Sequence, residues 1–517
     1  MPLRRQPPSL IQASMAAIAR HFDRICYAAA TPKEMAELLE TEEYLKVESP
    51  FTNLPAHLAE ELSDAVKSTS PIRRHHLHAL LSPATLQWTS SGVGDLLAAI
   101  DMLPQRCKNL QRLDIPYLRH INPNALISLA PCFTTLVSLN LRMTLLVDQM
   151  LAKIGEQCVH LLDLNLSSTP TTDRGVVMLC LASDGSARCQ KLRRLCVSDT
   201  WVTSAGAAVA LLALPVLREF DFERMFEVLR VLEAWSGRVG ERVMAALGVS
   251  SSRRPLEPRP SLCLTTVTSS GELAGGAAEG PAATARLCPS ATSVTVHATP
   301  LPSEALYPLM MLRHLTSLSL TTCPDEGDTM DFAQGVLPLL TAVGEQLTSL
   351  ILSKFAYVDV GAIGKACPHL VNFALSEVTE FELMHQKICE EHFQELQALE
   401  IWADPDFILP ANVLQQLLLF SKNMKNLLFK GVGILTDEMF RTIWKVNPMR
   451  HLSHLTLDHC HGITNATVHF ILDADNELTM LRIWSCYRIT KEAKNYITHR
   501  IMDENMDIYF DWFPVDE

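Results

Sequence analysis

The sequence predicts an α/β solenoid, with a parallel sheet of short strands on its concave face, helices outside, and a small helical segment before it. Two observations lead to this prediction. A pattern of the form Leu-x-x-Leu-x-Leu recurs between Leu110 and Ile483, and apart from one gap its starts lie 23 to 32 residues apart. Between these patterns, apolar residues return at the three- and four-residue spacing of a helix.

Each repeat is expected to fold as one strand followed by one helix. The alternating leucines of Leu-x-Leu lie on one side of a strand, whereas residues such as Val147, Met150, Leu151 and Ile154 share one face of a helix. A single unit cannot bury both faces, so the units must stack. The thirteen patterns begin at Leu110, Leu136, Leu161, Leu192, Leu217, Ala291, Leu315, Leu347, Leu370, Leu396, Met424, Leu452 and Leu478.

The composition narrows the range of functions. Hydrophobic residues make up 48% of the 517 residues and charged residues 20%, which is enough apolar material for a folded chain. The net charge of −13 and the lack of a basic stripe argue against nucleic-acid binding. No window approaches the roughly 18 apolar residues of a membrane span. The 14 cysteines recur at fixed places in the repeat and are expected to be reduced, buried thiols of a cytoplasmic or nuclear protein.

The chain divides into four regions. Residues 1–100 lack the repeat and form a helical segment, and residues 101–235 and 291–517 carry the repeats, the latter ending in a C-terminal cap. Residues 236–290 are rich in Gly, Ala, Ser, Pro and Arg and are expected to be a mobile, low-complexity insertion. The repeat starts on either side are 74 residues apart, close to three periods, so a degenerate repeat around Leu262-Cys-Leu264 is an alternative.

Cysteine has a regular place in many units. Segments such as Cys367-Pro-His-Leu370 precede a strand, and Leu455-Thr-Leu457-Asp-His-Cys460-His-Gly-Ile463-Thr464 runs through one. These segments resemble the cysteine-containing leucine-rich repeats found in many substrate receptors of ubiquitin ligases. The resemblance covers residues from about 105 to 517. It implies a horseshoe-shaped protein that recognises other proteins in the ubiquitin conjugation pathway.

The N-terminal segment begins with a predicted helix from about Ser9 to Ala29, because apolar or small residues recur every three or four positions and Ser9 can cap it. The stretch Ser9-Leu10-x-x-x-Ser14-x-x-x-Ile18 resembles the elongin box of von Hippel-Lindau-type substrate receptors. The resemblance implies that Leu10 fills an apolar pocket of elongin C, the partner of elongin B, and that the small residue Ser14 allows close approach of the helices. The family usually has cysteine at the position of Ser14.

A second motif follows at Leu54-Pro55-x-x-Leu58-x-x-x-Leu62 and resembles the cullin-2 box that accompanies the elongin box. It implies that these residues contact cullin-2. The same pattern also begins an F-box, which would instead link the chain to a cullin-1 ligase, although Ser68-Thr-Ser-Pro71 interrupts the helical pattern soon afterwards. A third interpretation is a scaffold without ligase partners, in which residues 9–62 only cap the solenoid.

No catalytic, cofactor or metal site is predicted, and the chain is therefore expected not to be an enzyme. Gly361-Ala-Ile-Gly364-Lys365 lacks the spacing of a phosphate-binding loop and belongs to a repeat helix. In His459-Cys460-His461 the cysteine occupies the inward position of the repeat. His75-His76-x-His78 has no second ligand pair at zinc-site spacing, and its histidines are expected to be solvated.

The intervening strand residues face solvent on the concave side, where a protein target can bind. Most are small or polar, as in Thr316, Ser317 and Ser319. The last repeats differ because they place tryptophan and charged residues there, the types that dominate interface energetics. The predicted target-binding residues are Trp402, Lys430, Asp458, Arg482 and Trp484.

An alternative interpretation turns the two tryptophans inward to cap the end of the solenoid. The aromatic cluster of Tyr509, Phe510, Trp512 and Phe513 is expected to seal the C-terminal end of the core.

Overall fold

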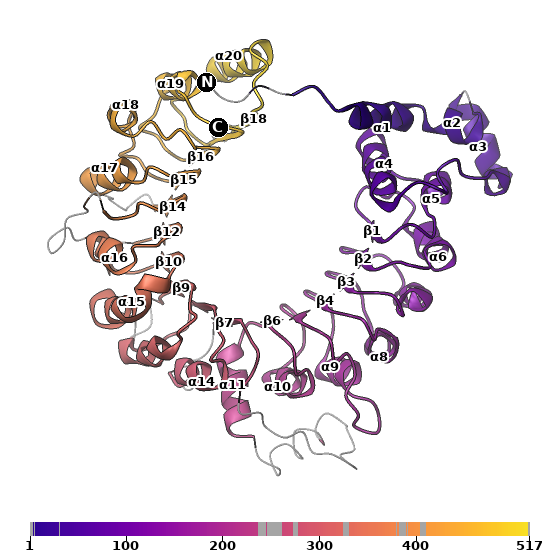
Figure 1. Cartoon of the computed structure of the whole chain (residues 1–517), viewed down its shortest axis with the longest axis horizontal. Coiled ribbons are helices and arrows are strands. Elements are labelled where there is room, and N and C mark those ends of the chain that lie inside the picture. The colour runs from indigo at the N-terminus through magenta and orange to yellow at the C-terminus, as the bar shows by residue number, and fades with distance from the viewer. Residues whose placement is uncertain are drawn as a thin grey trace. The chain divides into compact units, whose positions relative to one another are not determined.

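The computed structural model contains two parallel sheets with helices on one side of each (Figure 1). It describes residues 4, 6–29, 31–235, 245, 261–271, 278–323, 330–378, 380–381, 389, 391–403 and 410–514. The chain forms two compact units: an N-terminal unit of residues 7–223 and 228–264, and a C-terminal unit of residues 1–6, 224–227 and 265–517. The predicted α/β solenoid fold is confirmed.

The N-terminal unit holds a six-stranded sheet whose strands follow one another in chain order. Each strand has three residues, and its central residue points into the core, as Leu139 and Leu164 show with at most 1% exposure. The strands are β1 (Gln87–Thr89), β2 (Arg112–Asp114), β3 (Ser138–Asn140), β4 (Asp163–Asn165), β5 (Arg194–Cys196) and β6 (Glu219–Asp221).

The C-terminal unit holds a ten-stranded parallel sheet, and a two-stranded sheet of β11 (Tyr357–Val358) and β13 (Glu380–Phe381) accompanies it. Its strands have five residues, so each presents two residues to the core and three to the open side. The ten strands are β7 (Thr266–Ser270), β8 (Ser293–His297), β9 (Ser317–Thr321), β10 (Ser349–Ser353), β12 (Asn372–Ser376), β14 (Ala398–Trp402), β15 (Asn426–Lys430), β16 (His454–Asp458), β17 (Met480–Trp484) and β18 (Tyr509–Phe513).

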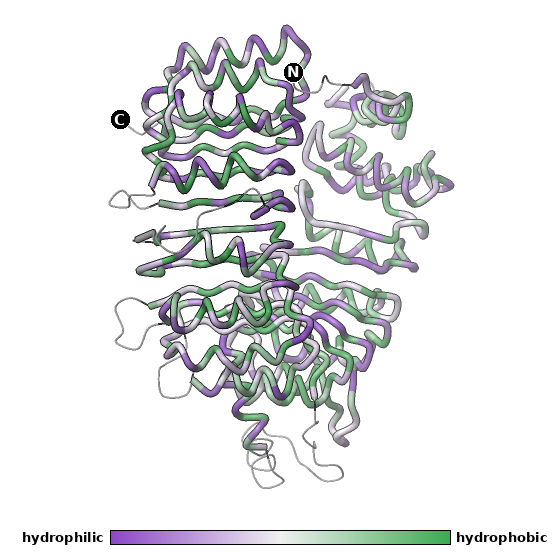
Figure 2. Tube along the Cα trace, turned by 60° about the vertical axis from the view of Figure 1, so that its left-hand side comes forward, coloured by the Kyte–Doolittle hydropathy of each residue, from purple (hydrophilic) through white to green (hydrophobic). Residues whose placement is uncertain are grey.

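All thirteen predicted patterns form strands whose leucine-type positions are buried, as Leu478, Leu481 and Ile483 are in β17 and the residues before it. Hydrophobic and hydrophilic residues alternate along the stacked repeats (Figure 2). Five strands were not predicted, and two of them are β11 and β13 of the two-stranded sheet. β1 lies inside the segment expected to be only helical, β7 lies inside the expected insertion, and β18 is the C-terminal aromatic cluster.

Part of the expected insertion at residues 236–290 belongs to the repeats. Residues 236–244, 246–260 and 272–277 lie outside the described residues, so the expected mobility there stays a prediction. Residues 261–271 and 278–290 instead form the degenerate repeat that the period allowed. Leu264 and Val267 are buried, and β7 pairs in parallel with β8.

Helices complete the repeats, and hydrogen bonds at their starts link neighbouring repeats. Several begin at a threonine N-cap that also donates to an aspartate at the start of the preceding helix: Thr172 Oγ1 lies 2.7 Å from Asp148, and Thr464 Oγ1 lies 2.7 Å from Asp437. The repeat helices are α6 (Leu96–Arg106), α7 (Pro123–Ile127), α8 (Asp148–Gln157), α9 (Asp173–Cys180), α10 (Ser204–Ala213), α11 (Met225–Glu233), α14 (Gly280–Leu287), α15 (Leu337–Val343), α16 (Val360–Ala366), α17 (Ala411–Phe420), α18 (Asp437–Val446), α19 (Asn465–Asp473) and α20 (Lys491–Asp503).

The N-terminal segment is helical up to residue 80, but the single helix predicted from Ser9 to Ala29 is broken at His21, whose backbone leaves the helical region. The predicted cap is confirmed: Gln12 N–H donates to Ser9 Oγ, and Ser9 N–H donates to the Gln12 side chain. The helices are α1 (Leu10–Arg20), α2 (Phe22–Tyr27), α3 (Pro32–Glu40), α4 (Ala56–Thr69) and α5 (Arg74–Leu80).

The histidines of α5 were expected to be solvated, and this prediction was wrong. His75, His76 and His78 are 2%, 6% and 3% exposed. They pack against the rings of Phe22, Tyr27 and Tyr44, which the sequence places far from them. Burial lowers the pKa of His76 and of His78 to about 4, which keeps both rings neutral at pH 7.

Candidate protein-binding surfaces

Helix α1 carries an exposed apolar ridge. Its inner face buries Met15 and Ala19, and the helix packs against α4. On the outer face Leu10 is 85% exposed, Ser14 is exposed and Ile18 is half-buried. We call these three residues the α1 ridge. An apolar helix face that the described chain leaves uncovered is typical of a binding surface.

Ser14 stands where the elongin box usually has cysteine. Its hydrogen bond within the helix lowers the free energy needed to bury a hydroxyl at this position. The Ser14 hydroxyl donates a hydrogen bond of 2.7 Å to the carbonyl oxygen of Leu10 within the helix. A hydroxyl whose donor is already satisfied loses little on burial against a partner. The ridge therefore keeps the small residue that close helix packing requires.

The second predicted motif is only partly available to a partner. Pro55 is exposed at the start of α4, and Leu54 and Leu58 are half-buried. Leu62 is completely buried, so its assignment as an adaptor-binding residue was wrong. It lies on the inner face of α4 with Val66, because the same four-residue spacing that suggested a ridge also serves a core.

The F-box interpretation needs a compact set of helices after Leu54 and Pro55. Between residues 56 and 86, all of which the structure describes, only α4 and α5 form, and the sheet then begins with β1 at Gln87. The segment is therefore shorter than the roughly forty helical residues expected of an F-box.

The predicted target-binding residues come together on the open face of the ten-stranded sheet. Strand pairing aligns Trp402 with Lys430, Lys430 with Asp458, and Asp458 with Trp484 on successive strands from β14 to β17. We call these four residues the aromatic row. Arg482 lies two residues before Trp484 and faces the same side. The sequence pattern thus selected residues that share one surface, although it could not show their contacts.

Both tryptophans interact with a cation. Lys430 Nζ lies 5.3 Å from the centre of the Trp402 ring, and the Arg482 guanidinium lies 5.6 Å from the centre of the Trp484 ring. Lys430 also approaches Asp458 at 3.9 Å. The Trp484 indole N–H donates to Asp511 at 3.2 Å.

The two tryptophans do not enter the core. Trp402 is 42% exposed and Trp484 is half-buried, while the neighbouring Ile401 and Ile483 fill the core positions. The Nε atom of Arg482 is covered but has no hydrogen-bond partner in the described part of the chain. A rigid aromatic surface beside an unused donor is suited to hold another protein.

The C-terminal aromatic cluster has a mixed role, which corrects the expectation that it only seals the core. In β18, Phe510 and Trp512 are half-buried opposite the core residues of β17. Tyr509 and Phe513 face the open side and are 60% and 57% exposed. Phe513 pairs with Trp484 and so extends the aromatic row.

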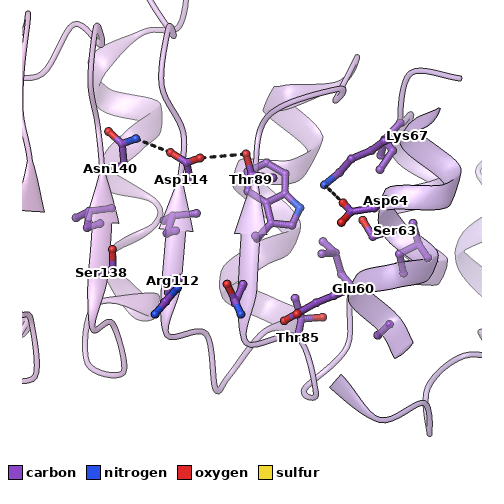
Figure 3. A pocket seen from close by; sticks show the side chains of 18 of the residues that line it. Glu60, Ser63, Asp64, Lys67, Thr85, Thr89, Arg112, Asp114, Ser138 and Asn140 are labelled. Carbon is purple, nitrogen blue, oxygen red and sulfur yellow. Dashed lines mark hydrogen bonds and ion pairs between the residues drawn. The ribbon is translucent and has the colours of Figure 1, made fainter. Parts of the chain in front are cut away.

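The N-terminal unit has a groove of about 590 Å³ between α4 and the open face of its sheet (Figure 3). Its polar groups largely satisfy one another. Thr89 Oγ1 and Asn140 Nδ2 both donate to the Asp114 carboxylate, at 3.3 and 2.6 Å, and Lys67 pairs with Asp64 at 3.0 Å. This groove was not predicted, although charged residues at alternate strand positions, such as Arg112 and Asp114 of β2, were a signal in the sequence.

Most of the cysteines belong to the core. Ten of the fourteen are buried, and Cys263 and Cys389 are exposed. Burial raises the pKa of Cys107 and of Cys367 to about 12, which leaves these thiols protonated and unreactive at neutral pH. Cys460 is completely buried at the inward position expected of it. The Gly361–Lys365 stretch lies in α16, as predicted.

Neither a protein-family model nor a curated protein matches the chain. Among solved structures, an internalin of Listeria monocytogenes matches at 13% identity over 82% of this chain and 95% of its own, with a TM-score of 0.36. The repeated leucine pattern and the parallel strands joined by helices give the chain the leucine-rich-repeat fold.

Two further solved structures match over most of their length. A leucine-rich-repeat protein of Leptospira interrogans is 13% identical over 86% of this chain and 93% of its own, with a TM-score of 0.35. A chain of the Rad7 and Elc1 complex of yeast is 12% identical over 94% of this chain and 96% of its own, with a TM-score of 0.41. At these identities the likeness concerns the fold alone. None of the described helices is long and apolar enough to span a bilayer.

Proposed function

We propose that this leucine-rich-repeat protein is the substrate receptor of an elongin B/C and cullin-2 ubiquitin ligase. The α1 ridge docks on elongin C, the exposed start of α4 approaches cullin-2, and the aromatic row with Arg482 holds the protein target. Other subunits carry out ubiquitin transfer, so the chain itself needs no active site. Its reduced cysteines suit the cytoplasm or nucleus.

The exposure of the α1 ridge carries this proposal. Leu10 is 85% exposed at the first turn of a helix whose inner face buries Met15 and Ala19. A helix that served only as a cap would turn its apolar residues inward, as Met15 does, whereas Leu10 and the adjacent Ile11 are both more than half exposed. The exposed leucine therefore favours a partner over the scaffold interpretation.

Replacement of Leu10 with Ser tests the adaptor site. Loss of a buried apolar anchor typically costs about 2 kcal/mol of binding, roughly thirtyfold in affinity. We expect Leu10→Ser to weaken binding to purified elongin B/C by that factor, measured by calorimetry, with no change in unfolding temperature.

Leu97→Ser is the matched control, because Leu97 is also an exposed leucine near the start of a helix, α6, in the same unit. It should bind elongin B/C as the natural chain does. Equal affinity of the natural chain and Leu10→Ser, or no binding by either, would remove the elongin assignment and leave the scaffold interpretation.

A further inference from the structure

Three side chains able to bind a metal meet inside the N-terminal helical segment. Asp23 comes from α2, and His75 and His76 come from α5. One ligand atom from each lies within 4.8 Å of the others, and within the described residues this is the only such group of histidine, cysteine and carboxylate side chains. None of the three residues belongs to the α1 ridge or to the aromatic row, so neither proposed surface uses the group.

The distances approach those of a tetrahedral ion. His75 Nε2 lies 3.2 Å from Asp23 Oδ1, and His76 Nε2 lies 3.8 Å from the same oxygen. Zinc bonds of about 2.0 to 2.2 Å to nitrogen and oxygen place neighbouring ligands roughly 3.3 Å apart. One pair already has this spacing, and a small shift of the His76 ring would bring the second pair to it.

The atoms of this group lack satisfactory partners. The His75 side chain is only 3% exposed, yet neither of its ring nitrogens has a hydrogen bond of good geometry in the described part of the chain. The same is true of Asp23 Oδ1, despite its short distance to His75. Buried polar atoms are almost always paired, and an ion held between His75 Nε2 and Asp23 Oδ1 would satisfy both of these atoms.

The group opens to solvent on one side. A cavity of about 480 Å³ is lined by Asp23 and His76, and the Asp23 side chain is 42% exposed. An ion can therefore enter and keep a water molecule as its remaining ligand. Arg20 and Arg24 line the same cavity and repel a cation, so the site should bind less tightly than a structural zinc-finger site.

We propose that Asp23, His75 and His76 form a binding site for a divalent transition-metal ion of the zinc type. Two imidazoles and one carboxylate are ligands that suit this ion, and the open position takes water. The bound ion would join α2 to α5 and give His75 Nε2 the partner that it lacks.

His76 is the weakest of the three ligands. Its Nδ1 accepts a hydrogen bond of 3.0 Å from the Arg73 amide, so the neutral ring carries its proton on Nε2. Coordination through Nε2 requires the proton to move to Nδ1 and gives up that hydrogen bond. We therefore expect Asp23 and His75 to contribute more to affinity than His76 does.

Titration of the full chain with Zn²⁺ and Co²⁺ tests the site, and a background with Cys263→Ser and Cys389→Ser removes the two exposed thiols. We expect one Zn²⁺ to bind per chain. Bound Co²⁺ should show visible ligand-field absorption without the near-ultraviolet charge-transfer band of a thiolate ligand. A thiolate band, or no stoichiometric binding of either ion, would overturn the proposal.

Variants distinguish the ligands from their surroundings. Asp23→Asn and His75→Gln should weaken Zn²⁺ binding by more than about tenfold, and His76→Gln by less. Asp64→Asn, at an exposed carboxylate of α4, should have no effect. If His75→Gln does not fold, Asp23→Asn decides, because Asp23 is partly exposed. Unchanged binding by a folded Asp23→Asn variant would exclude the site.

Discussion

The charged side chains on the open faces of the two sheets differ in what they contact. In the six-stranded sheet the charges pair with their neighbours: Arg194 lies between Asp163 and Glu219 and bonds to both carboxylates. In the last strands of the ten-stranded sheet the cations lie against tryptophan rings. Paired surface charges contribute little to binding, whereas aromatic side chains supply desolvated area. Charge at open strand positions alone is therefore a poor guide to a binding surface.

The difference between the sheets is confined to their open faces, because their cores are alike. Leu164 in β4 and Leu455 in β16 are both completely buried at equivalent positions of the repeat. We expect Leu164→Ala and Leu455→Ala each to destabilise its unit by about 3 kcal/mol, since both leave a cavity in a packed core. Urea unfolding followed by circular dichroism measures the effect.

His454 provides the control for this pair, because it neighbours Leu455 but is exposed on the open face. His454→Ala should change the unfolding midpoint far less than Leu455→Ala does. A small effect of either leucine substitution would mean that the two cores are not equivalent.

The thirteen strands were predictable because each core position carries a leucine or a similar residue, and a period of two fixes which side it faces. The five missed strands lack that pattern. β7 places Ser269 at a buried position, and Thr85 before β1 and Asp507 before β18 stand where the pattern begins with leucine. A pattern based on leucine cannot find strands whose burial depends on neighbouring repeats.

The candidate sites were predictable to the extent that they are local. The spacing of Leu10 and Ser14 placed them together on one helix, and the structure leaves both exposed. The burial of Leu62 and the meeting of Asp23 with His75 depend on packing between distant segments. Helical spacing alone does not show which face of a helix the rest of the chain covers.

A substitution in the aromatic row tests whether the open face of the ten-stranded sheet binds the target. Trp484→Ala removes a half-buried ring and its contact with Arg482, which typically costs about 2 kcal/mol of binding, roughly thirtyfold. We expect captured target proteins to fall accordingly in quantitative affinity purification, with elongin binding unchanged. A large drop in unfolding temperature would instead assign Trp484 to the fold, and undiminished capture would place the target surface elsewhere.

The paired charges of the six-stranded sheet give the smallest expected effect. Arg194→Met keeps most of the aliphatic side chain but removes the charge that lies between Asp163 and Glu219. Because the Arg194 side chain is 49% exposed, solvent screens both ion pairs, and we expect a loss of at most about 1 kcal/mol in unfolding free energy. Target capture should stay within twofold of the natural chain, on the order of the error of the measurement. A larger loss of capture would show that the paired charges on the open face of the six-stranded sheet also bind the target. The groove beside α4, which Arg194 lines, would then be part of the target-binding surface.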